Sequence, residues 1–115
     1  MKKNFFIGID IGGTKTAVIL ASINPDQTIK FIARKRFLTP IAKGPEATFK
    51  KIIKSISYLR EKNNLKFKNL AAIGISYGGP LDLNQHLIIS PPNLPGWQDF
   101  PLKEKLRQNF WNNGV

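Results

Sequence analysis

The sequence predicts an α/β domain built around a mixed β-sheet. Three segments with strand-like patterns fill the first 38 residues, and short turns between them favour antiparallel pairing. An amphipathic helix is expected over residues 46–62, and an apolar strand is expected after it over residues 70–76. A strand reached through a helix is expected to run parallel to a strand already in the sheet, which makes the sheet mixed.

The first strand is expected over residues 5–11, which are mostly apolar, and the second over residues 16–23. Residues 24–27 combine Asn, Pro and Asp, which is typical of a turn. The third strand is then expected over residues 28–38. Together these three segments predict an antiparallel meander.

Part of the third strand alternates between apolar and basic residues. Ile29 and Phe31 flank Lys30, as expected for a strand with one face on the core and the other in water. Pro40 and the Gly44-Pro45 pair then end the strand segment.

The helix over residues 46–62 carries one apolar stripe, because its apolar residues recur at helical spacing: Phe49, Ile52, Ile53, Ile56 and Leu59. This stripe is expected to pack on the sheet while the lysines face water. Asn63-Asn64 ends the helix. The strand over residues 70–76 is apolar throughout, which suits a central strand covered on both faces.

Residues 84–97 are the least regular part, with a short strand expected over residues 87–89, and a short helix is expected over residues 101–110. Three antiparallel strands, a crossover helix and a parallel strand are the opening of the ribonuclease-H-type topology. This order predicts that the turn after Asp10 and the turn at Gly78-Gly79 lie at the same edge of the sheet.

The turn that follows Asp10 has the composition of a phosphate-binding loop. Gly12 and Gly13 lack a Cβ, so their N–H groups can approach phosphate oxygens, while Thr14 and Lys15 add a hydroxyl and a cation. Asp10 is placed to hold a divalent metal, because Mg²⁺ bound with nucleotide takes one or two carboxylates and keeps several waters. The alternative is a simple hairpin whose two glycines serve only the turn.

Three separated motifs indicate a family. GIDIGGTKT at residues 8–16, GISYGGPLD at residues 74–82 and SPPNLPGWQDFPL at residues 90–102, in this order, resemble the N-terminal part of the ROK family. That family groups bacterial repressors, open-reading-frame proteins and sugar kinases such as glucokinase. The resemblance implies the actin-like ATPase form of the ribonuclease-H-type fold, and complete members phosphorylate a hexose with ATP.

The resemblance also implies site residues. The ATP phosphates are expected at the turn that follows the first strand (Gly12, Gly13, Thr14 and Lys15), with Asp10 on the Mg²⁺ side. The hexose, such as glucose, is expected against a second group of residues, although a purely structural tight turn is the alternative there: Gly78, Gly79, Pro80 and Asn93. Trp97 is expected to pack in the core rather than stack on a sugar, and His86 is expected to be structural or exposed.

No catalytic residue is assigned. In relatives the base is an Asp in an Asn-Asp-x-Asn segment that follows the equivalent of the helix at 101–110, and neither Asp82 nor Asp99 matches it. We therefore expect residues 1–115 to form a truncated N-terminal lobe that lacks its C-terminal lobe and is inactive alone. The alternatives are the remnant of a sugar-sensing ROK regulator, or a non-catalytic piece that associates with itself or with another chain.

Composition narrows the class of partner. The chain has 115 residues, no cysteine and a formal net charge of +11, yet its Lys and Arg are spread over a strand and two helices without a nucleic-acid-binding module. Solvated faces, or a surface that meets an acidic part of a longer protein, explain the charge better than nucleic acid does. The sequence shows no signal-peptide pattern and no apolar stretch of membrane-spanning length, so a cytoplasmic location is expected.

Overall fold

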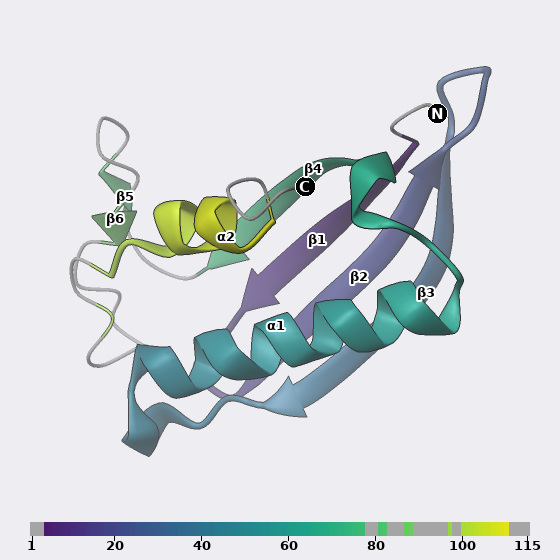
Figure 1. Cartoon of the computed structure of the whole chain (residues 1–115). Coiled ribbons are helices and arrows are strands. Elements are labelled where there is room, and N and C mark those ends of the chain that lie inside the picture. The colour runs from purple at the N-terminus through teal and green to yellow at the C-terminus, as the bar shows by residue number, and fades with distance from the viewer. Residues whose placement is uncertain (1–3, 78–80, 83–86, 89–96, 98–99, 111–115) are drawn as a thin grey trace.

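The computed structural model describes residues 4–77, 81–82, 87–88, 97 and 100–110 (Figure 1). Its main feature is a four-stranded sheet with the order β3-β2-β1-β4. The strands are β1 (Phe5–Ile11), β2 (Lys15–Ile23), β3 (Ile29–Leu38) and β4 (Leu70–Tyr77). A separate two-stranded sheet pairs β5 (Leu81–Asp82) with β6 (Leu87–Ile88).

The sheet is mixed, as the sequence predicts. β1 pairs antiparallel with β2, and β2 pairs antiparallel with β3. On its other side β1 pairs parallel with β4, which the chain reaches through α1 (Pro45–Lys62). Two parallel strands cannot be joined by a tight turn, so they require a long connection such as this helix.

Both α-helices cover one face of the sheet, where the hydrophobic core lies (Figure 1). α1 contributes its apolar stripe, and α2 (Leu102–Phe110) contributes Leu102, Leu106 and Phe110. The sheet contributes alternate residues of β1 and β2 that are almost fully buried: Phe5, Ile7, Ile9, Ile11, Val18 and Leu20. Burial of these side chains is the main force that holds the two layers together.

The Lys105 side chain of α2 contacts two residues of α1. The Lys105 ammonium lies 3.2 Å from the Glu46 carboxylate, and it also lies 5.4 Å from the ring centre of Phe49. At its other end α2 places Phe110 against Phe67, with the ring centres 5.0 Å apart. Phe67 belongs to the short 3₁₀ helix η2 (Phe67–Asn69), which leads into β4.

The start of α1 depends on a glycine. Another 3₁₀ helix, η1 (Ile41–Lys43), follows β3, and Gly44 then has φ 82° and ψ 175° before Pro45 opens α1. This backbone conformation is essentially restricted to glycine. Gly44 and Pro45 together therefore set the direction in which α1 leaves η1. Proline favours the first helical position because its fixed φ is compatible with a helix.

Two expectations about the strands are wrong. β4 is not covered on both faces in the described structure, because it is the edge strand of the four and Ala72, Gly74 and Ser76 are exposed. In β3 it is the apolar residues Ile29 and Phe31 that are exposed, by 68% and 60%. A register shift between Leu20 and Ala21 on β2 places Phe31 opposite Ala21, on the face that α1 and α2 leave open.

The open face carries a shallow groove along β1 and β4. Its volume is about 330 Å³, and Phe6, Gly8, Ile19 and Gly74 are among its lining residues. Among the described residues, no helix is long and apolar enough to cross a membrane.

Candidate functional site

The turn between β1 and β2 is held closed at its base. The Gly12 N–H donates to the Lys15 carbonyl oxygen at 3.0 Å. A Cβ added to Gly12 would lie 2.9 Å from the same oxygen, closer than side chains tolerate. A glycine is therefore needed at position 12 because a side chain would not fit there. The reason differs from that at Gly44, which has a positive φ.

The tip of this turn presents unpaired donors. Within the described part of the chain, no hydrogen bond uses the N–H groups of Gly13 and Thr14. Thr14 and Lys15 are exposed, so the turn also carries a hydroxyl and an ammonium on residues at and next to these two N–H groups. Successive free backbone N–H groups with a neighbouring cation form a suitable site for an anion.

The opposite side of the turn rests on Thr39, which directly follows β3. Its N–H donates to the Thr14 carbonyl at 2.8 Å, and its hydroxyl donates to the Gly12 carbonyl at 2.8 Å. The hydroxyl of Thr16 lies 2.7 Å from that of Thr39, and both residues are buried. This pair is not predicted by the sequence, because a contact between positions 16 and 39 leaves no local pattern.

Asp10 lies near the end of β1, beside the turn, and is exposed. Its register partners are Ala17 on β2 and Ser76 on β4. One carboxylate is a common protein contribution to Mg²⁺ that is bound together with a nucleotide. The described residues contain no group of three or more His, Cys, Asp or Glu that could hold a metal ion by themselves.

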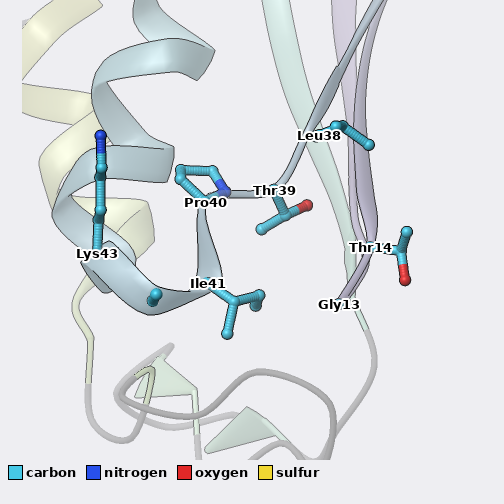
Figure 2. Close-up of a pocket in the computed structure, with 8 residues that line it drawn as sticks. Gly13, Thr14, Leu38, Thr39, Pro40, Ile41 and Lys43 are labelled. Atoms are coloured by element: carbon cyan, nitrogen blue, oxygen red, sulfur yellow. The ribbon is translucent and has the colours of Figure 1, made fainter.

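A pocket of about 490 Å³ lies next to the turn. Gly13 and Thr14 line one side of it, and Pro40, Ile41 and other residues around η1 line the other (Figure 2). Figure 2 also shows the Lys43 side chain running along α1, away from Thr14. The pocket thus offers an apolar wall beside the polar tip of the turn.

Comparison with known families supports the pattern of motifs. The ROK family profile matches residues 6–113, which is nearly the whole chain. The chain belongs to the ROK family. A curated relative, the glucokinase of Thermotoga maritima, is 27% identical over 106 residues, which cover 92% of this ROK chain and 31% of the relative. The chain thus spans about a third of the length of the relative that it matches.

Solved structures agree on the fold of this ROK chain. The diol dehydratase-reactivating factor in its nucleotide-free form superposes with a TM-score of 0.54 at 21% identity, over 70% of this chain and 13% of that chain. The Ppx/GppA phosphatase of Aquifex aeolicus superposes with a TM-score of 0.50 at 10% identity, over 93% of this chain and 33% of that chain. The predicted actin-like ATPase architecture is confirmed.

The expected sugar-binding residues of the ROK chain lie outside the described residues: Gly78, Gly79, Pro80 and Asn93. His86 and Asp99 also lie outside them, and Asp82 belongs to β5. The strand that leads to Gly78 is described, and its last residue, Tyr77, pairs with Ile11 of β1. The two strands that precede the two glycine motifs therefore end at the same edge of the sheet.

Trp97 packs in the core, as expected. Its side chain is fully buried, and its ring centre lies 5.2 Å from that of Phe100 in an edge-to-face arrangement. Phe100 in turn contacts Phe49 of α1, with the ring centres 6.4 Å apart. This aromatic cluster connects the segment before α2 to the helix that covers the sheet.

Proposed function

We propose that residues 1–115 form the N-terminal lobe, or part of it, of a ROK sugar kinase that phosphorylates a hexose such as glucose with ATP. Membership of the ROK family and the similarity to a glucokinase support this proposal. The chain spans only about a third of that relative, so we assign the complete reaction to the whole protein and not to this part alone.

The turn between β1 and β2 is the proposed phosphate site. The observation that carries this assignment is the pair of N–H groups, on Gly13 and Thr14, that have no acceptor within the described residues. The Lys15 ammonium and the Thr14 hydroxyl would add charge and a further donor. Asp10 would hold Mg²⁺ through water, and the bound ion would neutralise phosphate charge.

The hexose is proposed to lie against Gly78, Gly79, Pro80 and Asn93, near the edge where β1 and β4 end. Phosphoryl transfer to a sugar hydroxyl also needs a carboxylate base, and no residue of this chain is assigned to that role. We therefore expect no hexose phosphorylation by residues 1–115 alone. A cytoplasmic location is part of the same proposal.

A nucleotide titration followed by NMR tests the phosphate site. Mg-ATP should bind weakly to residues 1–115, and the largest amide shifts should fall on residues 10–16. Lys15→Gln should weaken binding by at least about tenfold, because a hydrogen bond to a charged group contributes about 1.5–3 kcal/mol and a factor of ten is about 1.4 kcal/mol. Lys30→Gln is the matched control, since Lys30 is an exposed lysine on β3 and the change in net charge is the same.

The two variants separate a specific site from a general attraction between anions and a basic chain. Equal weakening by Lys15→Gln and Lys30→Gln, with shifts spread over the basic face of α1, would show that polyphosphate binds only as a general anion. Absence of any binding would remove the support for a nucleotide site in this part of the chain.

A further inference from the structure

Two buried hydroxyls form a short relay behind the turn. The Thr39 hydroxyl has one proton, which it donates to the Gly12 carbonyl at 2.8 Å. In the contact between Thr16 and Thr39, whose oxygens lie 2.7 Å apart, Thr16 must therefore be the donor. The proton donors run in one direction, from Thr16 to Thr39 to the backbone of the turn.

This relay determines the orientation of one peptide group. The Gly12 carbonyl and the Gly13 N–H belong to the same planar trans peptide, so they point in opposite directions. Because the carbonyl is held toward Thr39, the Gly13 N–H is directed away from it. A peptide between two glycines otherwise rotates easily, since glycine has few steric restrictions.

A second hydrogen bond restrains the other half of the turn. The Thr39 N–H donates to the Thr14 carbonyl at 2.8 Å, so Thr39 holds two carbonyl groups of the turn. Thr39 and Thr16 are 8% and 0% exposed, so water competes little for these hydrogen bonds. The contact also ties the end of β3 to the turn between β1 and β2.

We propose that Thr39 is a positioning residue: its hydroxyl, oriented by Thr16, locks the Gly12–Gly13 peptide so that the Gly13 N–H faces the phosphate site. This inference rests on the proposed function for its ligand, whereas the lock itself can be measured without one. In this proposal Thr39 acts through its hydrogen bonds to the Gly12 and Thr14 carbonyl groups, and the ligand is held by the turn itself.

The test compares Thr39→Val, which removes the hydroxyl and keeps the shape, with Thr39→Ser, which keeps the hydroxyl. NMR without ligand should show that Thr39→Val shifts the Gly12 carbonyl and Gly13 amide resonances, and that Thr39→Ser restores them. With Mg-ATP as the probe, Thr39→Val should bind about tenfold more weakly than wild type, and Thr39→Ser should bind nearly as well.

Thr48→Val is the matched control. Thr48 on α1 is also fully buried, but its hydroxyl has no hydrogen-bond partner among the residues that the structure describes. The same substitution there should change neither the turn resonances nor the affinity for Mg-ATP. Circular dichroism and a melting curve of each variant confirm that the compared chains are folded.

The outcomes separate this inference from the proposed function. Unchanged Gly12 and Gly13 resonances in Thr39→Val overturn the lock, whatever the nucleotide does. Equal affinity of wild type and Thr39→Val for Mg-ATP also overturns the positioning role, and leaves the proposed function standing. Altered resonances together with a wild-type chain that does not bind Mg-ATP support the lock and count against the nucleotide site.

Discussion

Asp10 and Ser76 occupy one register position in the parallel pair formed by β1 and β4. On its other side Asp10 pairs with Ala17, so its exposed carboxylate lies between two small side chains. Small neighbours leave room for a cation that keeps most of its water. The arrangement also places the ends of two motif-bearing strands side by side.

The first prediction concerns this carboxylate. Mg²⁺ should strengthen ATP binding by the wild-type chain, and Asp10→Asn should reduce that gain by about threefold to tenfold, or about 0.7–1.4 kcal/mol. The reason is that the neutral amide of Asn attracts the hydrated Mg²⁺ less strongly than the negatively charged carboxylate of Asp10 does. Calorimetric titration with and without Mg²⁺ measures the difference.

Glu61→Gln is the control for Asp10→Asn, because Glu61 is an exposed carboxylate near the C-terminal end of α1. It removes the same charge and should leave the Mg²⁺ effect unchanged. If both variants respond alike to Mg²⁺, Asp10 is not the metal-side residue.

A second prediction follows from the backbone at Gly44. Its φ of 82° with ψ of 175° is strained for any other residue, so Gly44→Ala should lower the free energy of unfolding by about 1–3 kcal/mol. Gly74→Ala is the control, since a Cβ at Gly74 would meet no atom within 4 Å. Urea denaturation measures both, and an equal loss would show that the conformation of Gly44 is not the cause.

The third prediction concerns Tyr58 on α1. The Lys62 ammonium donates a hydrogen bond to the Tyr58 hydroxyl at 3.0 Å, and this bond lowers the pKa of the phenol, with the charges of Lys62 and Lys35 acting in the same direction. Absorbance titration should therefore show Tyr58 ionising below the usual pH for tyrosine, with Tyr58→Phe identifying its signal.

Substitutions of lysine test the cause of this shift. Lys62→Gln should raise the pKa of Tyr58 toward its ordinary value, because the ammonium that stabilises the phenolate is gone. Lys50→Gln, on an exposed position of the same helix, should change it little. A Tyr58 pKa that is unaffected by Lys62→Gln would contradict this account.

A fourth prediction concerns the edge of the sheet. Within the described residues, β4 pairs on one side only, so a row of backbone N–H and C=O groups is available to another chain. Residues 1–115 should therefore self-associate at high concentration despite the net charge of +11. Analytical ultracentrifugation over a concentration series measures this.

A charge on the exposed part of β4 should oppose that association. Ala72→Lys should weaken it by about tenfold, or about 1.4 kcal/mol, because a lysine disfavours pairing along an edge strand. Gln108→Lys adds the same charge on the exposed side of α2 and should have a smaller effect. A wild-type chain that stays monomeric at every concentration would refute the prediction.

Much of the fold could be predicted because the local patterns are strong. The strand expected over residues 5–11 coincides with β1, and the helix expected over residues 46–62 differs from α1 by one residue at its start. Alternation and helical spacing report which side of an element is apolar, and that information is local. The parallel pairing of β1 with β4 followed from the helix between them.

The errors and omissions have non-local causes. The exposure of Ile29 and Phe31 results from a register shift opposite β2, and nothing in the sequence of β3 announces it. The composition of the turn indicated a phosphate site. The hydrogen bonds by which Thr16 and Thr39 hold the turn could not be predicted, because they depend on how β2 and the end of β3 align.

The two irregularities of the sheet fall at the end far from the turn. Register shifts occur between Phe5 and Phe6 and between Leu20 and Ala21, and Phe6 pairs with Ala21. From that row to the turn the strands keep uninterrupted register. Loss or gain of one residue should therefore be tolerated best near the shifted row, whereas the same change near Asp10 would turn its carboxylate to the helix-covered face.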